Sequence, residues 1–277
     1  MGEENINKTE GKSFPFEKVF VIFSIIFFLM LAGFYGSRFY QYEKKKAADN
    51  AVYTLAEKLF DDARLTAKGE KLYGQQDAWI FRGSNEYNYL RYGGLLWRIM
   101  QINADGSVKL ISARPVNDLA FDDQLTGFAD SDVYQWLNGC FLDQLDKSLL
   151  VETACYADEV SDLSAVRTEN SVKVMVGLCD LVSYANSYLD GESYLGEGSF
   201  WLANVSDTGV YRTEAGGLTV SPAERFYGVR PVITLSAEAT APEGTGSIND
   251  PYHFKEEGVT IGTGIIPYVS YRLGYIF

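Results

Sequence analysis

The apolar positions of this chain follow three patterns along its length, and each pattern predicts a different kind of element. Residues 19–37 form one uncharged run bounded by Lys18 and Arg38. Residues 47–67 place apolar side chains at helical spacing. From about residue 74, apolar residues come in short runs divided by Gly, Asn and Asp, which is typical of strands joined by tight turns. This order predicts a membrane helix, a helical segment and then a sheet-rich domain.

The apolar run 19–37 is long enough, as a helix, to cross a hydrocarbon core of roughly 30 Å. It is longer than the apolar core of a signal peptide, and no A-x-A cleavage site follows it. We therefore predict an uncleaved, single-pass transmembrane helix, with residues 1–18 in the cytoplasm and the C-terminal domain outside the cell. Lys and Arg are nearly balanced on the two sides of the run, so the positive-inside rule leaves the orientation open.

Residues 38–69 are predicted to form a helical stalk, because 47–67 are rich in helix formers and Gly69 is a plausible stop. One apolar stripe follows this helix, made of Val52, Leu55, Ala56, Leu59 and Ala63. Two interpretations stay open at this point. The stripe packs on the domain of the same chain, or it pairs with another subunit.

Residues 74–277 are predicted to form one α+β domain, a mixed or antiparallel sheet with a few helices. Residues 103–106 predict a hairpin turn, since Asp-Gly tolerates the positive φ that such turns need. Ser131 and Asp180 are candidate N-caps of two helices, and "VKVMVGL" before Asp180 is read as a buried strand. Alternating apolar residues at 269–277 predict a last strand, which offers a second route to self-association besides the stalk.

The stretch "GVRPVITL" combines a buried strand pattern with Arg230 and Pro231. Alternation places Val232 and Thr234 on the face of Arg230, opposite Ile233 and Leu235. Proline fits only the start of a strand or an edge. A buried guanidinium needs several acceptors, so Arg230 is either a structural clamp or a ligand contact.

Six residues are candidate ligand-binding positions, because aromatic and guanidinium groups together can stack on a sugar ring. The alternative for each tryptophan is a place in the core, which is the commoner role of tryptophan in a strand. The candidates are Trp97, Arg98, Trp201, Asn204, Tyr227 and Arg230.

The charge of the chain narrows the choice of partners. The net charge is −13, and residues 1–46 carry seven Lys or Arg against five Asp or Glu, so residues 47–277 carry about −15. A body this acidic repels phosphate backbones, so we expect no nucleic-acid partner. Neutral glycans, cations and basic protein surfaces remain compatible with it.

Few residues suit catalysis or metal binding. The single histidine, His253, excludes most metal sites and catalytic triads, so we expect no metal and no cofactor. Three cysteines occur without a C-x-x-C pair, and Cys140 and Cys155 could form a disulfide if the domain is exported. Acidic pairs such as Asp122/Asp123 and Asp130/Asp132 leave open a carboxylate-dependent hydrolase.

An ordered series of motifs runs through the domain. It comprises "LLWRIMQIN", "YQWLNG", "SFWLANV", "YGVRPVITL" and "GTGSINDPYHF". The series resembles an uncharacterised extracellular domain family of Gram-positive bacteria, over roughly residues 86–255. The FWL and GVR motifs are also loosely similar to C-type-lectin-like and formylglycine-generating-enzyme-like folds, which implies an architecture and no activity. Neither the cysteines nor the tail beyond residue 255 matches that pattern.

These observations favour a membrane-anchored, non-enzymatic module of the cell surface. It would bind a neutral glycan or a protein, or assemble into a surface structure. A pilin-like subunit of a filament or secretion machine is the first alternative, since Glu17 opens the apolar helix. The residue pair that precedes pilin cleavage is missing, because Lys12-Ser13 stands there. The hydrolase is the second alternative.

Overall fold

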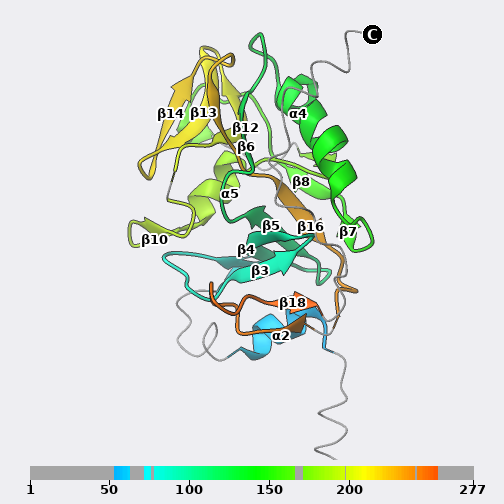
Figure 1. The fold of residues 1–277 in the computed structure, drawn as a ribbon. Helices are drawn as coiled ribbons and strands as arrows, with labels where there is room; N and C mark the ends of the chain where they lie inside the picture. The colour runs from blue at the N-terminus through cyan, green and yellow to red at the C-terminus, as the bar shows by residue number, and fades with distance from the viewer. Residues whose placement is uncertain are drawn as a thin grey trace, which may run out of the picture. The chain divides into compact units, whose positions relative to one another are not determined.

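The computed structural model describes residues 53–62, 72–75, 78–165, 171–196, 198–240 and 242–254 (Figure 1). The chain divides into two compact units, residues 1–51 and 52–277, and every described residue belongs to the second. None of the helices in these ranges is long and apolar enough to cross a membrane. The predicted span 19–37 and the predicted last strand 269–277 both lie outside the described residues.

The core of unit 52–277 is a seven-stranded antiparallel sheet. Its strands are, in spatial order, β1 (Leu72–Gln75), β2 (Ala78–Phe81), β4 (Leu95–Asn103), β5 (Val108–Ser112), β16 (Val232–Leu235) and β7 (Leu150–Val151). The seventh strand, β3 (Tyr89–Tyr92), pairs with the first half of β4. β2 pairs with the second half of β4 along the same edge. The sheet confirms the predicted α+β class, with strands as the main component.

The turn between β4 and β5 is the predicted hairpin at residues 103–106. Gly106 has φ of +83°, and the N–H of Asn103 donates to the carbonyl of Ser107 at 2.8 Å. The carboxylate of Asp105 accepts from the N–H of Ser107 at 2.9 Å, which orders the turn from within. Local residues thus specify the register of the two longest central strands.

The two faces of the central sheet pack into different apolar clusters. Ile99, Leu110 and Ile233 lie on the face that joins the larger cluster, together with the α4 region. Ile111 and Val232 point the other way, into a smaller cluster near α5. The alternation predicted for Val232 and Ile233 is confirmed.

The predicted strand "GVRPVITL" is two strands in different sheets. β15 (Phe226–Val229) pairs with β6 (Asn117–Ala120), whereas β16 lies between β5 and β7. Pro231 stands immediately before β16, where its missing N–H costs no ladder hydrogen bond, and its carbonyl accepts from Ser112 at 2.9 Å. Arg230 and Pro231 therefore carry the chain from one sheet to the next.

Two short helices begin at the predicted caps. Ser131 accepts from the N–H of Tyr134 at 3.2 Å and starts α4 (Asp132–Trp136), which continues as a π-helix over Leu137–Phe141 and a 3-10 turn over Leu142–Gln144. Asp180 accepts from the N–H of Ser183 at 2.7 Å and starts α5 (Leu181–Asn186). The strand predicted before Asp180 is shorter than expected: β9 covers Val172–Val174 only.

The remaining elements are small sheets and turns around the central sheet. They are β8 (Thr153–Cys155) with β9, β10 (Tyr188–Leu189) with β11 (Glu192–Ser193), the meander β12 (Trp201–Ser206), β13 (Gly209–Glu214) and β14 (Gly217–Ser221), the pair β17 (Pro242–Glu243) and β18 (His253–Phe254), and the 3-10 turns Phe128–Asp130 and Leu163–Ala165.

The first described helix, α2 (Leu55–Asp61), packs on the domain of its own chain. Leu55, Ala56 and Leu59 of the predicted stripe are buried, and the N–H of Leu55 donates to Ala239 at 2.7 Å. Tyr252, beside β18, donates its hydroxyl to Asp62 at 2.6 Å. Figure 1 shows β18 next to α2, so the first and last described segments lie at the same end of unit 52–277.

A tight contact at β15 gives a test of this packing. A Cβ at Gly228 would lie 2.7 Å from Pro115 Cγ and 2.8 Å from the carbonyl oxygen of Ser199, whereas a Cβ at Gly139 meets nothing within 4 Å. We expect Gly228→Ala to lower the free energy of unfolding by about 1–3 kcal/mol through overpacking. Urea denaturation followed by tryptophan fluorescence measures it, with Gly139→Ala as the control that adds a methyl group in open space within a helix and should not destabilise the protein. Equal stability of the two variants would contradict the described approach of β15 to Pro115.

Candidate functional site

The predicted ligand-binding residues do not form one site. The two tryptophans are core residues with no exposed surface. Trp97 Nε1 donates to the carbonyl of Tyr92, and Trp201 Nε1 donates to that of Leu119, each at 2.8 Å. Both indoles therefore have their hydrogen bond inside the protein, which supports the structural interpretation of each.

Tyr227 lies between Trp201 and an arginine that the sequence analysis did not single out. Its ring centroid is 4.8 Å from that of Trp201, at 88°, and the guanidinium of Arg212 lies 4.1 Å from the Tyr227 centroid. Arg212 donates to Ser221 and Ser199 and pairs with Glu214 at 3.2 Å. Arg212 stands in an apolar strand, as Arg230 nearly does, and that pattern could have identified it.

Arg98 and Arg230 come together on the α5 side of the central sheet, and the predicted pairing of arginine with aromatic rings is present there. Arg98 lies 4.0 Å from the ring centroid of Tyr89 and 5.2 Å from that of Tyr194. Its Nε donates to Asn88 Oδ1 at 2.6 Å, and Nη2 donates to the carbonyl of Asn85. Arg98 thus joins the loop before β3 to β4.

Arg230 is the most deeply buried arginine of this group, with 3% of its surface exposed. Nε donates to the carbonyl of Ser112 at 2.9 Å, and the guanidinium lies 4.7 Å from the ring centroid of Phe200. Nη2 has no hydrogen-bond partner. Burial, with a smaller contribution from the charge of Arg98, lowers the pKa of Arg230 to about 10, so the group is still protonated at neutral pH. Arg230 thus binds the last residue of β5 through one nitrogen and leaves another nitrogen without a hydrogen bond.

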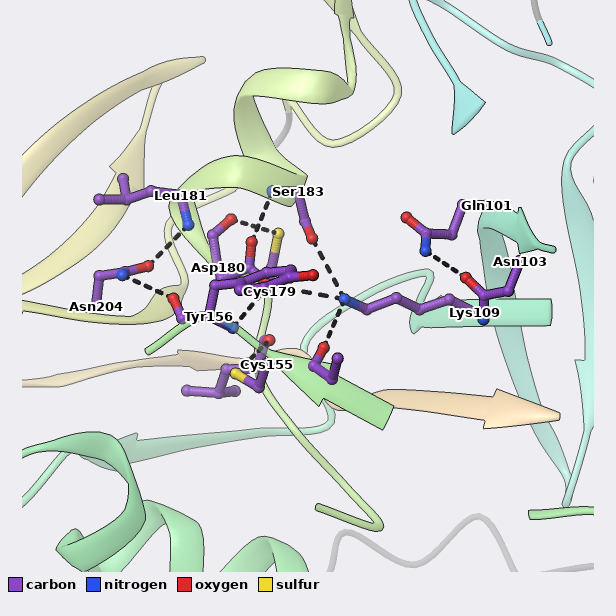
Figure 2. A network of polar contacts seen from close by, with 12 residues as sticks. Gln101, Asn103, Lys109, Cys155, Tyr156, Cys179, Asp180, Leu181, Ser183 and Asn204 are labelled. Carbon is purple, nitrogen blue, oxygen red and sulfur yellow. Dashed lines mark hydrogen bonds and ion pairs between the residues drawn. The ribbon is translucent and has the colours of Figure 1, made fainter. Parts of the chain in front are cut away.

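A second buried network surrounds Lys109 and Asp180, and Figure 2 shows it from close by. Lys109 Nζ lies 3.7 Å from Asp180 Oδ2, with side-chain exposures of 5% and 0%. The ammonium also donates to the carbonyl of Ala154 at 3.0 Å and to Ser183 Oγ at 3.3 Å. Besides capping α5, the Asp180 carboxylate accepts from the N–H of Tyr156 at 3.4 Å. The ion pair thus joins β5, β8 and α5.

Asn204, which is on the same strand as Trp201, belongs to this second network. Its Oδ1 accepts from the N–H of Leu181 at 2.8 Å, and Nδ2 donates to the carbonyls of Tyr156 and Asp158 at 2.8 and 3.0 Å. All three bonds go to backbone groups, and Figure 2 shows the two with Leu181 and Tyr156. Asn204 holds the start of α5 to the segment after β8, a role the sequence pattern did not reveal.

All three cysteines are free thiols in this structure, so the disulfide considered between Cys140 and Cys155 is not present. Cys155 Sγ donates to the carbonyl of Leu178, and Cys179 Sγ donates to that of Asp180, each at 3.6 Å. Burial, followed by the charge of Asp180, raises the pKa of Cys155 to about 12 and raises that of Cys179 as well. Neither buried thiol is an activated nucleophile.

Asp122 and His253 make local contacts. Asp122 accepts from the N–H of Asp123 and from the hydroxyl of Thr126, as in a turn. His253 Nε2 lies 3.6 Å from Glu243 across the β17–β18 pair. Among the described residues, no group of three His, Cys, Asp or Glu side chains is placed to hold a metal ion.

Comparisons with known proteins add no relative. No protein-family model matches the chain, and neither the curated proteins nor the solved structures contain a match.

The buried ion pair gives a stability prediction. We expect Lys109→Met to lower the free energy of unfolding by about 3–5 kcal/mol, because Asp180 would keep a buried charge without its cation. The double variant Lys109→Met with Asp180→Asn should be more stable than Lys109→Met alone, since asparagine can still cap α5. Chemical denaturation of the unmodified chain, of Lys109→Met, of Asp180→Asn and of the double variant completes the cycle.

An exposed ion pair supplies the matched control for this cycle. Lys147 and Asp143 pair at 2.8 Å with side chains 50% and 74% exposed, so Lys147→Met should cost less than about 1 kcal/mol. Similar losses for Lys147→Met and Lys109→Met would show that burial does not strengthen the inner pair.

Thiol reactivity tests the burial of the cysteines. At pH 8 iodoacetamide should modify Cys140 in the native protein, and should modify Cys155 and Cys179 only after unfolding. Because the folded pKa of both buried thiols is raised, the stability they contribute is complete below the ordinary thiol pKa and is lost as pH rises through the folded values. Peptide mass spectrometry locates the adducts, and alkylation of Cys155 in the native state would contradict this prediction.

Proposed function

We propose that this chain is a membrane-anchored module of the cell surface that acts by binding a partner. Residues 19–37 would be its single membrane-spanning helix, and unit 52–277 would lie outside the cell. Membership of the Gram-positive extracellular domain family and a C-type-lectin-like arrangement of the sheets belong to the same proposal, supported by the ordered motif series and by the α+β class.

The observation that carries the proposal is where the charged and aromatic side chains lie. Arg98, Lys109, Asp180 and Arg230 are buried, and they form hydrogen bonds with backbone carbonyls, backbone N–H groups or neighbouring polar side chains. A general acid or base must reach the proton that it transfers. These four side chains instead hold strands and loops together inside the unit. Such a role suits a rigid domain that binds a partner through its surface side chains.

Large apolar side chains are present on the surface of the same unit. Phe226 is 59% exposed and Trp79 is 45% exposed, and aromatic residues at the surface are the usual anchors of interfaces. The acidic charge of the body selects against nucleic acid and anionic polymers and is compatible with a neutral glycan or a basic protein.

Protease treatment of intact cells that produce the full-length chain tests the location. We expect unit 52–277 to be digested while a cytoplasmic marker protein survives. The variant Ile25→Lys with Phe28→Lys should leave the membrane fraction, since each charge near the centre of a span costs about 2.5–3.5 kcal/mol. Ile25→Ala with Phe28→Ala is the matched control and should stay in the membrane.

Three outcomes would contradict the proposal. Survival of the unit in shaved cells would show that it is not exported. A cleaved and methylated N-terminus in the mature protein would favour the pilin-like subunit. Hydrolysis of a neutral glycan by the purified chain would favour the hydrolase.

A further inference from the structure

The outward face of α2 combines aromatic and acidic side chains. Tyr53, just before the helix, and Phe60 are 41% and 37% exposed, and Glu57 and Asp61 are exposed between and beside them. Within the helix, the spacing of Glu57, Phe60 and Asp61 places these three on the side opposite the buried Leu55 and Leu59. We call these four residues together with Trp79 the aromatic–acidic surface.

Trp79 extends this surface from β2. Its ring centroid is 5.4 Å from that of Phe60, and the two planes meet at 78°. Gly74 lies opposite Trp79 in the β1–β2 pair, and a Cβ there would be 3.5 Å from the indole ring. The indole of Trp79 therefore packs on the backbone of β1 at Gly74. The rings of Phe60 and Trp79 meet edge to face and form an exposed corner, and these two contacts fix the position of the indole.

The charge around this corner is negative. Hydrogen bonds from the backbone and the hydroxyl of Thr54 lower the pKa of Glu57, which keeps this carboxylate ionised. Lys58 is the one cation among residues 53–62, which also contain Glu57, Asp61 and Asp62. A cation near these rings would meet both the ring faces and the carboxylates.

We infer that the aromatic–acidic surface docks a basic protein partner and receives a lysine or arginine side chain in the corner between Phe60 and Trp79. This inference rests on the proposed binding function and names its site. Charge complementarity favours a basic protein over an anionic lipid surface. The net charge of −13 would attract a cationic protein surface to the chain and repel anionic lipids. A neutral glycan would gain nothing from Glu57 and Asp61 as charges.

The tryptophans make this surface observable in the full-length chain held in a neutral detergent. Of the four tryptophans, Trp97, Trp136 and Trp201 have no exposed surface, so acrylamide quenching reports on Trp79. A decalysine peptide is the probe for a basic partner. We expect it to protect the fluorescence from acrylamide in a saturable way, and we expect the protection to fall as salt is raised.

Matched variants locate the binding. Calorimetric titration with decalysine should show Asp61→Asn with Trp79→Ala binding about three- to tenfold more weakly than the unmodified chain. The control is Glu224→Gln with Phe226→Ala, which removes one exposed carboxylate and one exposed aromatic near the start of β15 and should change the affinity less than about twofold. Thermal unfolding of both variants checks that they are folded.

Equal weakening in the two variants would show diffuse attraction to an acidic protein and would overturn the inference. Protection of Trp79 by maltohexaose or by phosphatidylglycerol vesicles, without protection by decalysine, would overturn it in favour of a glycan or the membrane. Either result can occur while unit 52–277 is still digested on intact cells, so the site can fail without the proposed function. Survival of the unit in shaved cells removes the proposed function whatever the peptide does.

Discussion

The buried ion pair between Lys109 and Asp180 is the contact on which the α5 side of the central sheet depends. A charge in an apolar interior is tolerated only when it is paired and hydrogen-bonded. Lys109 is a buried residue of β5 and therefore requires acceptors on its side of the sheet, which Ala154 of β8 and the start of α5 supply. Placing Asp180 there also sets the position of α5, because the same carboxylate is the cap of that helix.

The other buried cations on this side of the sheet contact oxygen atoms and aromatic rings. Cross-strand register puts Arg98 beside Ile111, and Ile111 beside Val232, on the face that carries Lys109 two residues earlier in β5. Arg98 finds carbonyl and amide oxygens together with two tyrosine rings, and Arg230 finds Ser112 and the ring of Phe200. Arg98, Lys109 and Arg230 thus attach neighbouring segments to this face of the sheet by hydrogen bonds. These attachments hold the segments that cover the smaller apolar cluster.

Contacts between residues that are close in the chain could be predicted from the sequence, whereas contacts between distant residues could not. Ser131 and Asp180 were predicted as caps, and the turn at Gly106 was predicted as a hairpin, because each acts within a few residues. The bond of Asp180 to Lys109 joins residues far apart in the chain, and no spacing rule predicts such a pair. Asn204 was predicted to be a candidate ligand-binding residue, yet its three bonds go to backbone groups around α5. For the tryptophans of "WRI" and "FWL", a strand pattern favours the core without excluding a ligand, and only the structure gives them no exposed surface.

The contact of α2 with the closing segment would have a mechanical consequence if, as we propose, the domain is held from its N-terminal side. A pull on residue 52 would reach the bond between Leu55 and Ala239 and the bond between Tyr252 and Asp62 before it reached the central sheet. These links tie the first helix to segments that come nearly two hundred residues later, so the load would pass across the unit without unzipping the strands in sequence. The residues that flank the small β17–β18 pair would then carry the load between the first helix and the rest of the unit.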